Sequence, residues 1–293
     1  MIRVIAVTGL ATVQDAGRPG RMHDGIPPGG ALVAELLAVA NAAVDNPPGE
    51  AGIEVFGAIT LAADEPLRVA ADGARPRWLG GGEPWTVTTA GARVRYIAVR
   101  GGIDVAPVLG GRGTLLAGGF GGHEGRPLRP GDTLRITTRK QANDFFSGAG
   151  GSPGPEPGRL DPAAPIRVVP GPDLERFAPE ALALLLASPF EVAAQSDRVG
   201  MRLRGVALPR AGDDAALSGP MVLGAIQVPA AGEPIVLGPD HPTMGGYPVV
   251  ATVVRADVGV LMARAIGAIV RFSLGRDGLG RGSIDPPRVV RTP

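Results

Sequence analysis

The chain of 293 residues contains no cysteine, which excludes disulfide bonds, thiolate metal sites and a cysteine nucleophile. Histidine is also scarce. The three histidines, His23, His123 and His241, are scattered rather than clustered, so no metal site is expected. Aromatic residues make up only 4% of the chain, with 2 tryptophans and 2 tyrosines.

Neither sign of charge dominates, because 29 basic residues face 28 acidic ones and the net charge is +1. No block of lysine or arginine stands out, so nothing indicates binding to nucleic acid or to a membrane surface. No apolar run approaches the roughly 20 residues of a membrane span. The apolar N-terminal run is too short for a signal peptide and predicts a strand followed by a turn. We therefore expect a cytoplasmic location.

Glycine and proline are abundant, at 46 and 30 residues, and they are spread along the whole chain. This distribution predicts many short strands joined by tight turns. Helices are expected at 30–44, 174–187 and 258–265. Short segments rich in valine and isoleucine predict strands at 68–70, 94–99, 133–137, 166–169, 235–237, 249–254 and 268–272. The expected fold class is mostly β with a few helices.

Residues 147–165 are dominated by glycine, proline and serine and are interpreted as a linker. This linker separates a first β subdomain, residues 1–146, from a second, residues 166–275. The last segment, residues 276–293, has no apolar period and is expected to be a flexible tail.

Four short patterns recur in the same order in both halves, which we interpret as an internal duplication. One pair, 65–72 and 233–240, has Glu, Pro and Asp at identical spacing. The alternative is that β proteins rich in glycine and proline produce such similarities by chance. Two small closed barrels would leave few free strand edges. The four pairs are 14–18 with 195–200, 65–72 with 233–240, 99–104 with 254–258 and 131–136 with 267–272.

Two of these repeated segments carry polar turns whose side chains are suited to binding a ligand. The first contains Gln14, Asp15 and Arg18, and the second contains Asp197 and Arg198. An arginine is suited to bidentate recognition of a carboxylate, so the two turns can face a shared ligand site between the halves. The alternative is structural, with each aspartate capping its own turn and pairing with its arginine.

The most distinctive segment runs from Gln227 to Val250 and combines a strand, a polar turn and a Gly-Gly-Tyr-Pro corner. His241 can serve as a general acid or base, or can be a turn histidine bonded to backbone. Tyr247 can stack on a ligand or pack the corner. Small-molecule sites are often built from such loops.

Two glycine-rich loops, residues 80–83 and 118–125, can cradle an anion with their amides or can be tight turns. Neither is followed by the Gly-Lys-Ser/Thr of a phosphate-binding loop, so nucleotide binding is not indicated by a motif. No Gly-x-Ser-x-Gly elbow is present, which leaves serine catalysis unsupported.

The order of several motifs resembles the biotin-dependent carboxyltransferase family, also called allophanate hydrolase subunit 2, over residues 3–273. The resemblance implies two cyclophilin-like β-barrel subdomains, in agreement with the repeat, and a companion subunit 1. The motifs are TVQDAGRPG, VRGGIDVAPVLGGRGT, GGFGGHEGRPLRPGDTLRI, QSDRVGMRLRG, GAIQVP and DHPTMGGYP.

Three functions follow from the resemblance. The first is a subunit of an ATP-dependent 5-oxoprolinase, which opens 5-oxoproline to glutamate together with subunit 1 and a lactam-hydrolysing subunit. ATP is then a cofactor of the complex. The second is a carboxyltransferase component that moves a carboxyl group to urea or a similar amide from biotin carried on another protein. The third is a regulatory protein that binds and antagonises an inhibitor of a kinase. We take the first as the leading hypothesis.

Under this hypothesis, Arg18 and Arg198 bind an anion, and Gln227 hydrogen-bonds an amide. The aspartates orient the arginines or handle protons, and the glycines let a planar ligand approach the backbone. His241 and Met244 stand where many relatives have Arg and Thr, which puts the identity of the substrate in doubt. The expected catalytic residues are Asp15, Asp197, Asp240 and His241. The expected substrate-binding residues are Gln14, Arg18, Arg198, Gln227, Thr243, Gly245, Gly246 and Tyr247.

Overall fold

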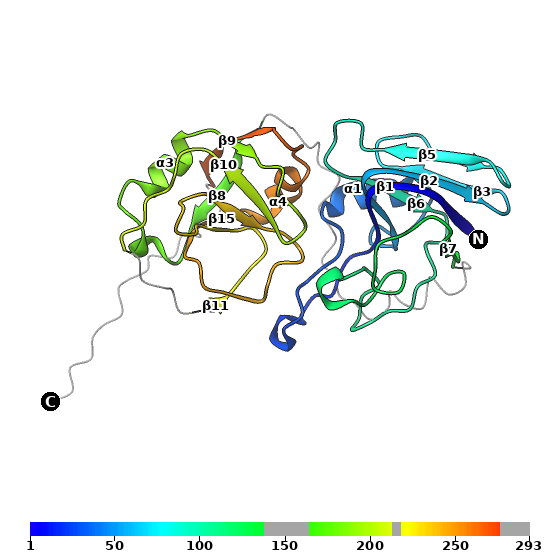
Figure 1. The fold of residues 1–293 in the computed structure, drawn as a ribbon, viewed down its shortest axis with the longest axis horizontal. Coiled ribbons are helices and arrows are strands. Elements are labelled where there is room, and N and C mark those ends of the chain that lie inside the picture. The colour runs from blue at the N-terminus through cyan, green and yellow to red at the C-terminus, as the bar shows by residue number, and fades with distance from the viewer. Residues whose placement is uncertain (138–163, 213–217, 276–293) are drawn as a thin grey trace.

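The computed structural model describes residues 1–137, 164–212 and 218–275, which form two lobes that lie side by side (Figure 1). The first lobe is residues 1–137 and the second is the described part of residues 164–275. Most of the expected linker and the whole expected tail lie outside the described residues. Those two segments, and the boundaries of the two subdomains, therefore stay predictions.

The first lobe is built on a seven-stranded sheet with the order β4-β3-β6-β2-β1-β7, and β5 also pairs with β2. All of its ladders are antiparallel. The consecutive connections from β2 to β6 are short, which suits the many turn-forming residues of the sequence, whereas residues 15–51 join β1 to β2. The strands are β1 (Ile2–Gln14), β2 (Gly52–Ala63), β3 (Leu67–Ala71), β4 (Arg77–Leu79), β5 (Pro84–Thr88), β6 (Arg95–Val99) and β7 (Thr133–Leu134).

Strands β1 and β2 form a long ladder in which Gly9 lies opposite Gly57. Both glycines have positive φ angles, 86° and 107°. A Cβ on Gly9 would collide with the carbonyl oxygen of Phe56, and one on Gly57 with that of Thr8. The close approach of the two backbones at this point therefore requires glycine on both strands.

The second lobe is built on an eight-stranded sheet with the order β16-β9-β10-β13-β12-β15-β8-β17. Its ladders are antiparallel except for the parallel pair β17 and β8. A separate two-stranded ribbon joins β11 to β14. The strands are β8 (Ile166–Pro170), β9 (Phe190–Val192), β10 (Gly200–Arg204), β11 (Gly219–Pro220), β12 (Ala225–Gln227), β13 (Ile235–Leu237), β14 (Met244–Gly245), β15 (Val249–Val253), β16 (Ile269–Val270) and β17 (Phe272–Leu274).

The mostly-β prediction is confirmed, including a nearly closed, barrel-like sheet, and the structure refines its details. The expected strand at 268–272 is two strands with different partners, since β16 pairs with β9 and β17 with β8. The expected strand at 133–137 is reduced to β7.

The three expected helices are present with shifted bounds. The α-helices are α1 (Ala34–Ala43), α3 (Ala181–Ala187) and α4 (Arg255–Met262), and the 3₁₀ turns are η1 (Met22–Asp24), η2 (Leu116–Gly118) and η3 (Leu174–Arg176). The helix expected at 174–187 divides into η3 and α3. Pro179 lies between them, lacks a backbone N–H and disfavours helix at the preceding residue.

One hydrophobic core extends across both lobes. It includes Leu37 of α1 and Tyr96 of β6 from the first lobe, together with Phe190 and Leu261 from the second. Helices α1 and α4 face each other where the lobes meet (Figure 1). There the carboxylate of Glu35 lies against the backbone of α4, close to where a side chain at position 259 would begin. A second core, within the first lobe, fills the other face of its sheet.

The duplication predicted from the repeat is consistent with two sheets of similar construction, although strand neighbours differ between the lobes. In the first lobe β3 pairs directly with β6. In the second lobe the corresponding strands by sequence, β13 and β15, are separated by β12. The repeated patterns thus mark strand ends and turns rather than the same pairs of neighbours.

Candidate functional site

The turn that follows β1 is organised by the carboxylate of Asp15. It accepts hydrogen bonds from the backbone N–H groups of Gly17 at 2.8 Å, Arg112 at 2.6 Å and Gly113 at 3.0 Å. Gln14, also buried, donates to a threonine hydroxyl and to a backbone carbonyl. Both side chains tie the turn to the loop after β6. The hydrogen bond from Gly17 is the turn cap of the structural alternative, whereas the side chain of Arg18 bonds to carbonyls and not to Asp15.

Arg18 is enclosed by backbone carbonyls and its side chain is 1% exposed. Nε donates to the carbonyl of Val108 at 2.9 Å, and Nη2 donates to the carbonyls of Gly111 and Gly113. The guanidinium also lies 5.0 Å from the centre of the Phe120 ring. Among the hydrogen bonds of the described residues, none comes from Nη1. The Nη1 group of this buried guanidinium is therefore open to another hydrogen-bond acceptor.

The glycine-rich loop 118–125 forms part of the wall around Arg18. A Cβ on Gly121 would collide with Arg18 Nη2 and with a carbonyl oxygen. The amides of Gly118, Gly122 and Gly125 donate to carbonyls of the same region. The loop at 80–83 is also closed on itself, by backbone bonds and by the Glu83 carboxylate. The tight-turn interpretation accounts for both loops.

The turn between β9 and β10 is held by Asp197, whose side chain lies near the surface. Its Oδ1 accepts hydrogen bonds from the amides of Val199 and Gly200, both at 2.9 Å. The Arg198 guanidinium instead points into the interior, where its hydrogen bonds go to other residues. Asp15 and Asp197 therefore both accept hydrogen bonds from amides of their own turns, but the neighbouring arginines have different surroundings.

Arg198 joins the two lobes through a buried ion-pair network. Nε and Nη2 donate to the two oxygens of Asp240 at 2.7 and 2.8 Å. Nη1 donates to Glu54 of the first lobe at 2.6 Å, and Nη2 also donates to the carbonyl of Gly30 at 2.7 Å. Burial disfavours the charge, but Glu54 and Asp240 outweigh it, and the pKa of Arg198 is raised. All three nitrogens are engaged, so an incoming anion would have to displace a carboxylate.

Glu54 and Tyr96 belong to this network and were not singled out from the sequence. They are cross-strand neighbours on β2 and β6. The hydroxyl of Tyr96 donates to Glu54 Oε2 at 2.6 Å, and burial raises its pKa well above the ordinary value. A glutamate within the apolar strand GIEVFGAIT was the available signal, because a buried carboxylate requires a partner.

The two polar turns and the Asp240 loop meet at Gly29. Its amide donates to the carbonyl of Pro239 in the second lobe at 2.9 Å. A Cβ placed on Gly29 would lie 3.4 Å from Arg18 Nη1 and 3.9 Å from Asp240 Oδ1. Burial lowers the pKa of Arg18, an effect that Asp15 and Asp240 partly offset. Arg18, Asp240 and Arg198 are thus brought together between the lobes, as expected.

His241 follows Asp240 and its side chain is buried. Nδ1 lies 2.8 Å from the carbonyl oxygen of Pro242, so Nδ1 carries the proton and donates it. Nε2 is buried and has no hydrogen-bond partner among the described residues. Burial lowers the pKa of His241, which favours the neutral imidazole. A neutral imidazole with a bare Nε2 can accept a proton or a hydrogen bond.

Gln227 lies beside the ribbon formed by β11 and β14. Its Nε2 donates to the carbonyl of Tyr247 and contacts the sulfur of Met221, both at 3.1 Å. A Cβ on Gly245 would lie 2.8 Å from the same Nε2, so glycine leaves room for the amide. Tyr247 is 51% exposed and Met244 is 52% exposed. Thr243 and Gly246, from the same loop, are half-buried.

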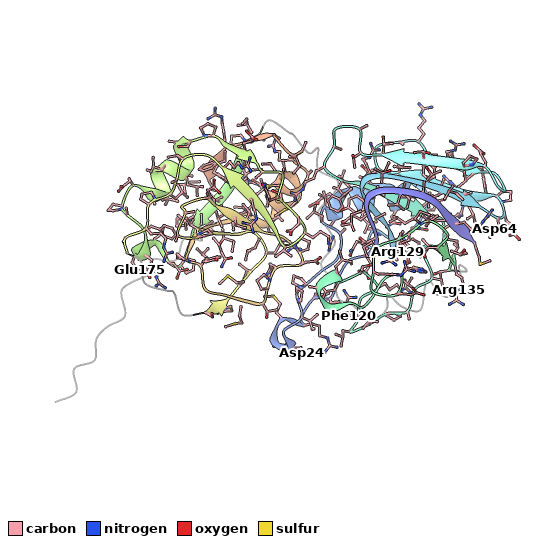
Figure 2. The ribbon with its side chains drawn as sticks, in the orientation of Figure 1. Asp24, Asp64, Phe120, Arg129, Arg135 and Glu175 are labelled. Carbon is pink, nitrogen blue, oxygen red and sulfur yellow. The ribbon has the colours of Figure 1, made fainter. Side chains whose placement is uncertain are left out.

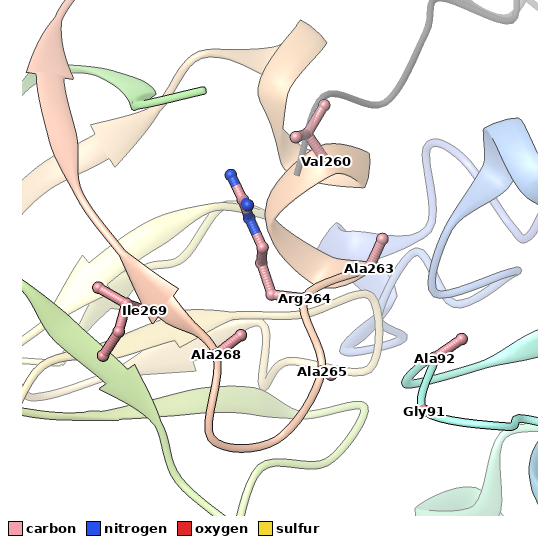
Figure 3. Close-up of a pocket in the computed structure, with 8 residues that line it drawn as sticks. All are labelled: Gly91, Ala92, Val260, Ala263, Arg264, Ala265, Ala268 and Ile269. Atoms are coloured by element: carbon pink, nitrogen blue, oxygen red, sulfur yellow. The ribbon is translucent and has the colours of Figure 1, made fainter. Parts of the chain in front are cut away.

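A separate groove of about 340 Å³ lies where the lobes meet (Figure 3). Small apolar side chains line most of it, and Arg264 is the charged member. None of the residues predicted for the site lines this groove. The lining residues are Gly91, Ala92, Val260, Ala263, Arg264, Ala265, Ala268 and Ile269.

Within the part of the chain that the structure describes, no group of three or more His, Asp or Glu side chains could hold a metal ion. No helix in the same residues is long and apolar enough to cross a membrane. Figure 2 shows Phe120, whose ring lies against the Arg18 guanidinium, and Asp24 toward the same lower side of the first lobe. The catalytic and binding roles given to the site residues stay predictions.

Comparison with known proteins identifies the family. The model of the carboxyltransferase domain, subdomain A and B, matches residues 24–90 and 84–274. The chain is 34% identical to a 5-oxoprolinase subunit of Escherichia coli over 288 residues, which covers 93% of this chain and 90% of that protein. It is 29% identical to urea amidolyase of Lachancea kluyveri, covering 84% of this chain and 15% of that enzyme.

A solved structure shares the fold. Urea amidolyase of K. lactis matches with a TM-score of 0.80 and 25% sequence identity, over 93% of this chain and 18% of that one. The chain thus corresponds to a limited region of the urea amidolyases but to nearly all of the bacterial subunit. By its family model and its relatives, this protein is a member of the carboxyltransferase domain family, to which a bacterial 5-oxoprolinase subunit and the corresponding region of urea amidolyase are also related.

Proposed function

We propose that this chain is a subunit of an ATP-dependent 5-oxoprolinase, which opens 5-oxoproline to glutamate together with companion subunits. The observation that carries the proposal is the match to the Escherichia coli 5-oxoprolinase subunit, which extends over 93% of this chain and 90% of that relative. The match to urea amidolyase covers only 15% of the larger enzyme. The higher identity to the bacterial subunit, 34% against 29%, favours the 5-oxoprolinase assignment.

The substrate is a cyclic amide that carries a carboxylate, and Arg18, Gln227 and the 241–248 loop carry groups that match it. Arg18 has an open Nη1 to bind the carboxylate. The amide of Gln227 is suited to the lactam, and exposed Tyr247 can cover the ring. Asp240 and the bare Nε2 of His241 are the groups we assign to proton handling.

We assign ATP to the complex and not to a particular site on this chain. Several amides of the glycine-rich loops already donate to backbone carbonyls or to Glu83, and neither loop carries a phosphate-binding motif. The partners in this proposal are the companion subunit 1 and a lactam-hydrolysing subunit.

The test is reconstitution. The chain is co-purified with subunit 1, the third component is added, and ATP-dependent release of glutamate from 5-oxoproline is measured. Release that requires all three components supports the proposal. Absence of release, together with carboxylation of urea by carboxybiotin, contradicts it.

A pair of exposed apolar side chains allows a sharper test of the site. Tyr247→Ala is expected to lower kcat/KM for 5-oxoproline by about tenfold, because the variant loses the stacking contact between the tyrosine and the substrate ring. Val222→Ala is the matched control, because Val222 is 52% exposed and Tyr247 51%. Equal activities of the two variants would remove Tyr247 from the site.

The second candidate is a carboxyltransferase component that acts on urea or a similar amide with biotin on another protein. The description of the family model and the TM-score of 0.80 to K. lactis urea amidolyase favour it. In the third candidate, the chain only binds and antagonises a kinase inhibitor. Binding of subunit 1 with no turnover of either substrate is the outcome expected of that regulatory protein.

A further inference from the structure

The segment of residues 29–33, which precedes α1, is held by hydrogen bonds from both lobes. From the second lobe, Pro239 accepts from the Gly29 amide and Arg198 donates to the Gly30 carbonyl. From the first lobe, Glu54 Oε2 accepts from the Leu32 amide at 2.7 Å and the Tyr96 hydroxyl accepts from the Val33 amide at 2.9 Å. This explains why the helix expected from residue 30 begins at residue 34.

Glu54 is the centre of this arrangement, because its two oxygens serve different lobes. Oε2 binds Leu32 and the Tyr96 hydroxyl within the first lobe. Oε1 binds Nη1 of Arg198, which holds both oxygens of Asp240. The exposed fractions of Glu54, Tyr96 and Arg198 are 0%, 0% and 4%, so water does not compete for these bonds.

From this geometry we propose that Glu54 and Tyr96 are positioning residues that hold Asp240 beside Arg18. Glu54 and Tyr96 do not hydrogen-bond to Arg18 or Asp240 themselves. They act on these two residues through Arg198 and the 29–33 segment. Arg198 holds Asp240 by two hydrogen bonds, and the segment carries Gly29, which lies close to both Arg18 Nη1 and Asp240 Oδ1. The inference rests on the proposed function only in its choice of Arg18 and Asp240 as the site.

The test uses the full chain carrying Glu54→Gln or Tyr96→Phe, with hydrogen–deuterium exchange of backbone amides as the first readout. A glutamine at position 54 can still accept from Arg198 with its oxygen, but its nitrogen cannot accept from the Leu32 amide. We expect exchange at Leu32 to rise about tenfold or more, which is the loss of one charge-assisted hydrogen bond.

The backbone amide that distinguishes a positioning role from a local one is that of Asp240, in the second lobe. Asp240 N donates to the Arg198 carbonyl and is not in contact with Glu54. If Glu54 positions Asp240, exchange at Asp240 rises in Glu54→Gln, while exchange at Val253 within the second sheet is unchanged. A rise confined to Leu32 and Val33 means a local structural role and overturns the proposal. Should Glu54→Gln not fold, Tyr96→Phe, which loses one hydroxyl, decides by the same criterion.

The second readout is kcat of the reconstituted complex with 5-oxoproline. We expect kcat to fall by about tenfold in Glu54→Gln and to be unchanged in the exposed control Glu65→Gln. Raised exchange at Asp240 with unchanged kcat overturns the positioning role. If the wild-type complex does not open 5-oxoproline, the proposed function fails, and exchange at Asp240 alone then decides the inference.

Discussion

Arg18 and Arg198 are both buried, but their guanidinium groups have different neighbours and therefore different expected roles. Arg198 is saturated by Asp240, Glu54 and a backbone carbonyl. Arg18 is bound by carbonyl groups, which carry no full charge, and keeps one nitrogen open. A cation held without a direct carboxylate is the better candidate for an anionic ligand. The anion-binding role proposed for both arginines stays a prediction, and these surroundings favour Arg18 over Arg198 for it.

Removal of the Arg198 side chain is expected to destabilise the protein strongly. Arg198→Ala leaves Glu54 and Asp240 buried without their cation, at a cost of about 3–5 kcal/mol. Arg202→Ala, on the exposed face of β10, is the matched control and should change stability by less than about 0.5 kcal/mol. Urea denaturation of both variants measures the difference. Similar midpoints would show that the ion pairs add little.

The titration of His241 is expected to make the folding stability of the protein depend on pH. Burial lowers its pKa in the folded state, so the unfolded chain binds the proton more readily. Its contribution to stability is complete above the ordinary histidine pKa near 6.5 and is lost as the pH falls through the folded-state value. His241→Asn keeps a donor for the Pro242 carbonyl and removes the titration. The stability difference between pH 7.5 and pH 5 should therefore be smaller in the variant, as measured by urea denaturation.

At the scale of elements, the loop 118–125 requires glycine at different positions for different reasons. Gly119 and Gly121 both have positive φ angles, 64° and 74°. A Cβ on Gly119 would meet nothing within 4 Å, whereas one on Gly121 would collide with Arg18 Nη2 and the Gly113 carbonyl. The loop conformation alone requires the first glycine, and the packing around Arg18 requires the second.

The two glycines form a matched experiment. Gly119→Ala should cost only about 1–2 kcal/mol of stability, because alanine is strained in the left-handed region. Gly121→Ala should cost clearly more and should also lower activity, because Arg18 must move. Denaturation curves and the glutamate assay on both variants provide the measurement. Equal losses in the two variants would mean that the contact with Arg18 is unimportant.

At the scale of the whole molecule, the lobes share one core and one ion-pair network. Arg93 adds to this contact, since it donates to the carbonyl of Asp197 across the junction. Burial lowers the pKa of Arg93 to about 10. A shared core of this kind couples the folding of the two lobes.

Cooperative unfolding of both lobes can be measured directly. Trp78 and Trp85, the 2 tryptophans of the chain, lie in the first lobe, so tryptophan fluorescence reports on that lobe. Far-ultraviolet circular dichroism reports on both. We expect the two signals to give the same urea midpoint. Separate midpoints would mean that the lobes unfold independently and that the junction is weak.

The sequence by itself determined the mostly-β fold class, the approximate places of most strands and helices, and the family. Local patterns suffice for these, because strand periodicity, turn residues and motif order are written in neighbouring residues. Local patterns failed where they conflict with tertiary contacts. Residues 30–33 fit a helical pattern but are not helical, since the amides of Leu32 and Val33 bind Glu54 and Tyr96 instead.

Only the tertiary structure decided which polar residues meet. Glu54, Tyr96, Arg198 and Asp240 are far apart in the chain, and no periodicity links residues on different sheets. Their partnership follows from burial, because an ionised side chain removed from water must find an opposite charge or a donor wherever the fold brings one.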